Sequence, residues 1–138
     1  MSSMGKKTNY VDTSALIALL DKGDSYHIFF ASLFQNPPSL FTTPLVIAEG
    51  QAWFLKRYDR YMSLRFLTFI EECTSLKIEP VTKVDVLEAN KMIRKFSDQN
   101  LTLTDACGLW LMKKHGVTQC WSTDHHLSLT GVPLVIHQ

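Results

Sequence analysis

The sequence predicts a single α/β domain with a mainly parallel central sheet, and two observations lead to that prediction: the alternation of segment types and the chain length. Short runs rich in β-branched and aromatic residues alternate with longer stretches of helical periodicity along the whole chain. Such alternation is typical of strand–helix–strand units, whose strands lie parallel. The length of 138 residues leaves little room for a second domain, so we expect a single domain over residues 1–138, with residues 1–7 as a flexible tail.

The first half of the chain predicts a strand, two helices, a second strand and two further helices. Thr13 or Ser14 is suited to cap the first helix, and Asp24 or Ser25 is suited to cap the second. Thr43, which precedes a proline, is a strong start for the third helix. The predicted elements are, in chain order, strand 8–12, helix 15–21, helix 26–34, strand 39–43, helix 45–58 and helix 60–73.

The second half predicts three short strands and two helices. Thr82 and Asp85 have the spacing of a capping box, which predicts the start of a helix, and Gly116 is suited to end the helix that follows. The predicted elements are strand 76–81, helix 82–96, helix 101–116, strand 117–122 and strand 133–137.

The composition excludes several classes of protein. Lys and Arg number 14 against 13 Asp and Glu, so the net charge gives no signal for a polyanionic partner, and binding of nucleic acid would need local patches. Cys73, Cys107 and Cys120 are odd in number and form no CxxC pair, which argues against a disulfide framework and a structural zinc site. Because no run of about 18 apolar residues and no signal-peptide pattern is present, we expect a cytoplasmic protein that does not enter a membrane.

Four carboxylates interrupt apolar or helix-capping contexts. Asp12 and Asp124 follow predicted strands, whereas Glu49 and Asp105 lie in the first turns of predicted helices. Taken singly, each has an ordinary structural explanation as a turn residue, a surface glutamate, a helix cap or a loop residue. Ligands of parallel sheets bind beyond the carboxyl ends of the strands, and the four side chains could meet there.

If the four carboxylates converge, their mutual repulsion requires a cation to offset it. Carboxylate oxygens are hard ligands that suit Mg²⁺ or Mn²⁺, and an acidic pocket holding such an ion implies hydrolysis of a phosphate ester. A phosphatase or a phosphotransfer receiver would also place an aspartate after the first strand. The phosphatase needs a second aspartate where Ser14 stands, and the receiver needs a lysine on a late strand, which residues 133–138 lack.

Four segments resemble the successive motifs of PIN domains, most closely those of the VapC-type toxins of bacterial toxin–antitoxin systems. They read YVDTSALIALLDKGDSYH, TTPLVIAEG, LTLTDACGLWLMKKHG and STDHHLSLTGVPLV. The resemblance implies a three-layer α/β/α sandwich that acts as a Mg²⁺- or Mn²⁺-dependent endoribonuclease. It also implies an RNA substrate, a cognate antitoxin and a homodimer.

The resemblance assigns catalytic and metal-binding roles to Asp12, Glu49, Asp105 and Asp124. The three aspartates would hold the ion, directly or through water. Glu49 would hold a second ion or help to deprotonate the attacking water. Cleavage of the phosphodiester would leave a 5′-phosphate and a 3′-hydroxyl.

Further residues receive supporting roles. The hydroxyl of Thr13 or Ser14 would orient a carboxylate, and Asp98 matches an additional acidic residue that many family members carry. His126 falls in a D-x-H pattern that would lie near the substrate. Because we expect His125 and His126 to lie on an extended segment, their side chains should point apart and make a poor chelating pair.

The helices 45–58 and 60–73 carry the densest basic stretch and a surplus of apolar residues. Lys56, Arg57 and Arg60, with tyrosines between them, would contact RNA by charge and stacking, or would form an ordinary solvated face. The apolar surplus predicts a surface for a protein partner, as in the dimer contact and antitoxin groove of VapC-type toxins. Its residues are Trp53, Phe54, Phe66, Phe69 and Ile70.

Two alternatives to a toxin stay open. A housekeeping PIN-domain nuclease for RNA processing would have the same motifs, and a small open reading frame directly upstream would distinguish the two. A non-catalytic binding module would have lost acidic residues, and all four are present.

Overall fold

A computed structural model describes residues 8–138, so the predicted flexible tail of residues 1–7 lies outside the described part. Its centre is a four-stranded sheet in the order β3-β2-β1-β4, in which every pairing is parallel. The strands are β1 (Asn9–Val11), β2 (Leu40–Thr42), β3 (Leu76–Ile78) and β4 (Cys120–Trp121). The predicted parallel α/β sheet is therefore confirmed.

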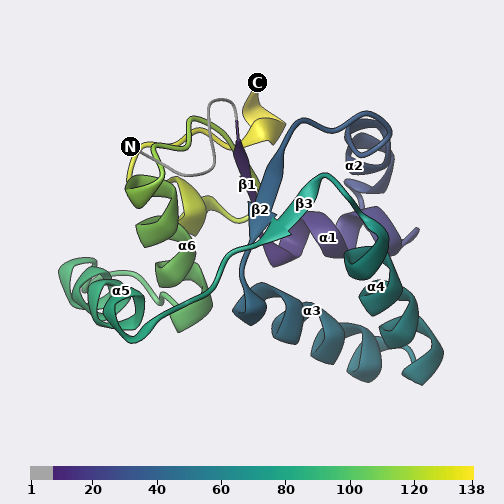
Figure 1. The fold of residues 1–138 in the computed structure, drawn as a ribbon, viewed down its shortest axis with the longest axis horizontal. Coiled ribbons are helices and arrows are strands. Elements are labelled where there is room, and N and C mark those ends of the chain that lie inside the picture. The colour runs from purple at the N-terminus through teal and green to yellow at the C-terminus, as the bar shows by residue number, and fades with distance from the viewer. Residues whose placement is uncertain (1–7) are drawn as a thin grey trace.

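Within residues 8–138, six α-helices cover the two faces of this sheet and complete the predicted three-layer sandwich. In Figure 1, α5 and α6 lie to the left of the strands, α1, α2 and α4 lie to their right, and α3 runs below them. The helices are α1 (Thr13–Leu20), α2 (His27–Leu33), α3 (Pro44–Arg57), α4 (Arg60–Glu72), α5 (Lys83–Lys95) and α6 (Leu103–Lys114). None of the helices within residues 8–138 combines the length and the apolar character needed to cross a bilayer.

The central strands are buried because helices cover both faces of the sheet. All residues of β1 and β2 are buried, and Tyr10 of β1 packs edge-on against Phe41 of β2. Two glycines allow the covering helices to approach closely. A Cβ on Gly50 would lie 2.4 Å from the Phe66 ring, and a Cβ on Gly108 would lie 2.8 Å from the Tyr10 hydroxyl.

The helix caps differ from the sequence prediction at two places. Asp12, not Thr13 or Ser14, caps α1, because its carboxylate accepts the Ser14 N–H and the helix already includes Thr13. At α2 the N-cap position is Tyr26, which makes no side-chain cap, while Asp24 accepts the Tyr26 N–H at 2.8 Å and closes a turn before the helix. The predicted starts at Thr43 and Thr82 are confirmed, the latter with a complete capping box.

The predicted strand 133–137 is wrong. Leu134 makes a single parallel bridge with Cys120, and the chain then turns into a short 3₁₀-helix, η2 (Val135–His137). β4 offers only two residues for pairing, and Pro133 lacks an N–H to donate, so no ladder extends from this bridge. A second 3₁₀-helix, η1 (His125–Ser128), follows β4 and packs against α6.

Candidate active site

Asp12 directly follows β1, a central strand, and is held at the carboxyl edge of the sheet. Its N–H donates to the Trp121 carbonyl at 3.0 Å, and its side chain is 4% exposed. One carboxylate oxygen, Oδ2, accepts the Ser14 hydroxyl at 3.0 Å, the Ser122 hydroxyl at 3.0 Å and the Ser14 N–H at 3.4 Å. Asp12, which the sequence alone would explain as a turn residue, therefore has a buried carboxylate that two hydroxyls hold in place.

Of the two hydroxyls predicted beside this aspartate, the structure selects Ser14. The Thr13 hydroxyl is buried and has no hydrogen-bond partner within residues 8–138. Ser122 is a partner that the sequence prediction missed. The available signal was its place directly after β4, since β4 pairs with β1 and so brings Ser122 to the edge where Asp12 lies.

The two serines also tie Asp12 to the loop that carries Asp124. The Ser14 oxygen accepts the Thr123 N–H at 3.0 Å, and the Ser122 oxygen accepts the Asp124 N–H at 2.9 Å. Each hydroxyl thus donates to a carboxylate and accepts from the main chain, which uses its capacity in both directions. The backbone of Asp124 is consequently fixed relative to the carboxylate of Asp12.

Asp105 enters from the first turn of α6. Its N–H donates to the Thr102 hydroxyl at 3.1 Å, and the residue is 8% exposed. Burial raises the pKa of its carboxyl, and the negative charges of Asp124 and Glu49 raise that pKa further. Thr102 therefore caps this helix as expected, and the carboxyl of Asp105 lies close enough to Asp124 and Glu49 to be influenced by their charges.

The electrostatic couplings join all four predicted carboxylates into one group. Burial raises the pKa of Asp12 to about 6, and the charge of Asp105 adds to this shift while the bonds from Ser14 and Ser122 oppose it. Glu49 belongs to the group through Asp105 and is exposed on α3. Asp98 lies in the exposed turn after α5.

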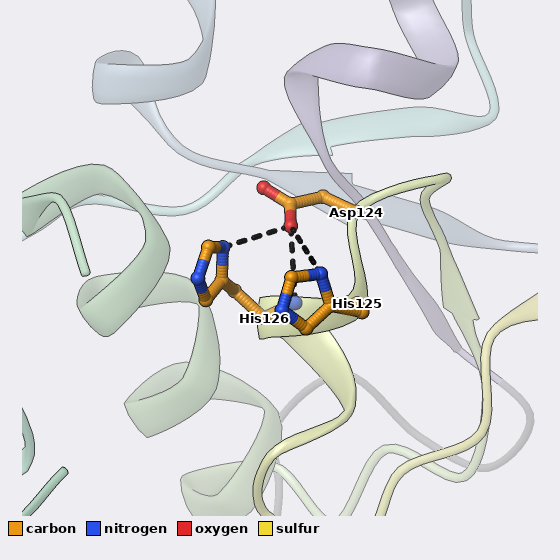
Figure 2. A group of neighbouring side chains, drawn as sticks. All are labelled: Asp124, His125 and His126. Atoms are coloured by element: carbon orange, nitrogen blue, oxygen red, sulfur yellow. Dashed lines mark hydrogen bonds and ion pairs between the residues drawn. The ribbon is translucent and has the colours of Figure 1, made fainter. Parts of the chain in front are cut away.

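Asp124 and the two histidines after it form a compact cluster at the start of η1 (Figure 2). Asp124 Oδ1 accepts the His126 N–H at 3.0 Å and lies 2.9 Å from His126 Nδ1 and 3.9 Å from His125 Nδ1. The ring centroids are 4.2 Å apart at an interplanar angle of 32°. The expectation that the two histidines point apart is wrong, because the chain turns here and does not extend.

The predicted basic residues lie where α3 ends and α4 begins. Lys56 and Arg57 end α3 and Arg60 begins α4, and all three are exposed. Lys56 follows Glu49 by seven residues on one helix, a rise of roughly 10 Å. The neighbouring Tyr58 donates its hydroxyl to Asp21 at 2.6 Å, which holds this ring to α1.

The predicted apolar surplus is largely core. Phe54, Phe66 and Ile70 are buried, because α3 and α4 pack against each other and against the sheet. Different apolar side chains of α2, α3 and α4 are exposed instead, among them Ile28 at 82% and Tyr61 at 67%.

A family model described as PIN domain matches residues 10–132, which include all four carboxylates. No curated protein matches the sequence. Several solved structures are similar in fold, among them the three that follow. VapC20 from Mycobacterium tuberculosis, described as a Sarcin-Ricin loop cleaving toxin, has a TM-score of 0.82 at 22% identity and covers 89% of this chain and 95% of its own.

The second is a chain of a toxin–antitoxin complex from Klebsiella pneumoniae, with a TM-score of 0.61 at 17% identity, covering 92% of this chain and 95% of that one. The third is PAE2754 from Pyrobaculum aerophilum, with a TM-score of 0.65 at 20% identity, covering 98% and 89%. The similarity therefore extends over nearly the full length of each protein.

Proposed function

This chain belongs to the PIN domain family, and on that premise we propose that it is a divalent-metal-dependent endoribonuclease, the toxin of a type II toxin–antitoxin pair acting in the cytoplasm. One observation carries the proposal. Carboxylates from four separate parts of the chain act on one another electrostatically, and the pKa values of Asp12 and Asp105 are raised by burial and by the charges of other members. Such a group is costly unless a cation joins it.

The donor set fits Mg²⁺ or Mn²⁺. Its members offer carboxylate oxygens, and within residues 8–138 no lysine or arginine forms an ion pair with them. Asp12, Asp105 and Asp124 would hold the ion, with Glu49 at the exposed rim. When bound, the ion supplies the positive charge that offsets the carboxylates and stabilises the charge developing on the phosphate.

The residues of the chain would divide the remaining work. Ser14 and Ser122 hold the Asp12 carboxylate in one orientation. Glu49, exposed and close enough to influence Asp105, would accept the proton of the attacking water. The water oxygen bonds to phosphorus as the bond to the 3′-oxygen breaks, and that oxygen takes a proton from solvent to leave a 3′-hydroxyl and a 5′-phosphate.

RNA is the proposed substrate class because the M. tuberculosis neighbour is described as a toxin that cleaves the Sarcin-Ricin loop. The Klebsiella neighbour belongs to a toxin–antitoxin complex, which supports an antitoxin as partner. Lys56, Arg57 and Arg60 remain candidate contacts for a part of the RNA distant from the scissile bond.

An antitoxin or a second copy of the chain would bind the exposed apolar face of α2, α3 and α4. A groove of about 480 Å³ between α1 and α4, lined by Leu20, Leu64 and Phe69 among others, adjoins this face. The exposed apolar side chains on or next to α2, α3 and α4 are Tyr26, Ile28, Phe29, Leu55, Tyr58, Tyr61 and Leu64.

The test incubates the purified chain with structured RNAs, including a sarcin–ricin loop hairpin, with Mg²⁺, with Mn²⁺ and with EDTA. Asp12→Asn is the matched variant, with its fold checked by circular dichroism. We expect cleavage by the unmodified chain that needs the metal, leaves 5′-phosphate ends and is lost in Asp12→Asn. Equal cleavage by the folded variant, or cleavage that persists in EDTA, would overturn the proposal.

A further inference from the structure

The cluster of Asp124, His125 and His126 brings three metal-ligating atoms of consecutive residues to one place (Figure 2). Asp124 Oδ1 and one nitrogen of each ring all lie within 4.8 Å of one another. Both Nδ1 atoms face the same carboxylate oxygen, at 2.9 Å for His126 and 3.9 Å for His125. The arrangement is a preformed cluster of two nitrogens and one oxygen.

The spacing of the donors suits a small tetrahedral ion. Zinc bonds of about 2.0–2.2 Å to nitrogen and oxygen place neighbouring ligand atoms roughly 3.4 Å apart. The separations of 2.9 and 3.9 Å from Asp124 Oδ1 lie on either side of this value, and all three ligand atoms lie within 4.8 Å of one another, so small side-chain rotations would bring them to this spacing. The His125 side chain is 74% exposed, which leaves a fourth position open to water.

The donor chemistry selects a different class of ion from the acidic group. Imidazole nitrogen suits Zn²⁺ and its transition-metal neighbours, whereas Mg²⁺ takes oxygen ligands.

From this geometry we propose that Asp124, His125 and His126 form a second metal site, which binds Zn²⁺ and competes with the acidic group for Asp124. Asp124 belongs to both sets, since its charge acts on Asp105 while its Oδ1 faces the histidines. Zn²⁺ at the histidines withdraws this carboxylate from the Mg²⁺ site and slows cleavage. The inhibition rests on the proposed nuclease function; the binding does not.

Binding is tested with Co²⁺, whose visible absorption is strong in a tetrahedral site and weak in an octahedral one. The full chain should give an intense band that Zn²⁺ removes. His125→Ala and His126→Ala should each weaken binding by at least about tenfold. His137→Ala, an exposed histidine of η2, should leave the band unchanged, and so should Glu49→Gln, which alters only the acidic group. A band unaffected by both ligand substitutions, or a weak octahedral spectrum, would overturn the site.

Inhibition is tested by titrating Zn²⁺ into a Mg²⁺-supported cleavage reaction. His125→Ala should keep cleavage and need at least about ten times more Zn²⁺ for half inhibition than the unmodified chain. Inhibition at the same Zn²⁺ concentration in both would show that Zn²⁺ acts at the acidic group and would refute the competition. If the unmodified chain cleaves no RNA while the Co²⁺ band behaves as expected, the nuclease proposal fails and the metal site stands.

Discussion

The Ser122 hydroxyl lies 3.0 Å from Asp12 Oδ2, although 110 residues separate the two in sequence. The same oxygen of Ser122 accepts the Asp124 N–H at 2.9 Å. One buried serine therefore connects the carboxylate that directly follows β1 with Asp124, the N-cap residue of η1. The order of the sheet makes this possible, because β1 and β4 are neighbours.

Ser122→Ala should lower both stability and activity. It removes a hydroxyl from Asp12 and leaves the Asp124 N–H without its acceptor, a loss of about 1–3 kcal/mol in the free energy of unfolding. Urea unfolding and RNA cleavage measure the two effects. Ser32→Ala, on the exposed side of α2, is the control and should change neither. An unchanged cleavage rate in Ser122→Ala would show that the bond to Asp12 does not matter for the reaction.

Without metal, the stability of the fold should fall as the pH rises from about 4 to about 6. Burial raises the pKa of Asp12 from 3.8 to about 6 in the folded chain, so the folded state binds more protons than the unfolded state in this window. The loss of folding stability caused by the Asp12 charge is absent below about pH 4 and complete above about pH 6. It amounts to roughly 3 kcal/mol.

Denaturant unfolding in EDTA at several pH values measures this slope. Asp12→Asn removes the titrating group, so we expect a flatter pH profile and a more stable metal-free protein at pH 7. Added Mg²⁺ should stabilise the unmodified chain more than this variant, because a ligand of the folded state raises its stability. A variant that keeps the full slope would refute the assignment of the shift to Asp12.

Gly108→Ala should destabilise the folded chain, whereas replacing glycine by alanine within a helix usually stabilises it. In an ordinary helix interior alanine is better than glycine by about 0.5–1 kcal/mol. Here the added carbon would lie 2.8 Å from the Tyr10 hydroxyl and 2.9 Å from its ring, which forces α6 away from β1. The expected cost is about 1–3 kcal/mol, with a fall in cleavage because α6 carries Asp105. Thermal unfolding decides the sign, and a stabilised variant would contradict the close packing.

Asp85→Ala should cost stability without touching the chemistry. The Asp85 carboxylate accepts the Thr82 N–H, the Thr82 hydroxyl, the Trp110 Nε1–H and the Lys114 ammonium, at 2.9 to 3.3 Å. Losing this cap and these bonds should lower the free energy of unfolding by roughly 2–4 kcal/mol. Glu88→Ala breaks an exposed pair with Lys91 on the same helix and should cost less than about 1 kcal/mol. Equal losses in the two variants would refute the role of the buried bonds.

The sequence was sufficient for the elements whose signals are local. Strand–helix alternation predicts the parallel sheet, and the caps at Thr43 and Thr82 lie where their hydrogen-bonding side chains require. It failed at 133–137, where an apolar run pairs only through Leu134 because β4 is too short to template a ladder. It also failed at His125 and His126, whose relative direction depends on a turn that Asp124 caps.

The two Thr-x-x-Asp segments separate what the sequence determines from what the tertiary structure decides. By itself the spacing determines that Thr82 and Thr102 start helices and that each aspartate lies in the first turn. Only the fold decides the roles of the carboxyls. Although Asp85 is buried, which raises its pKa, bonds from Thr82, Trp110 and Lys114 bring that pKa down to about 2. Asp105 is buried against Asp124 and Glu49, and its pKa is raised. The same local geometry thus gives a structural anchor beside donors and a candidate metal ligand beside other carboxylates, because a pKa depends on the charges that tertiary packing brings near.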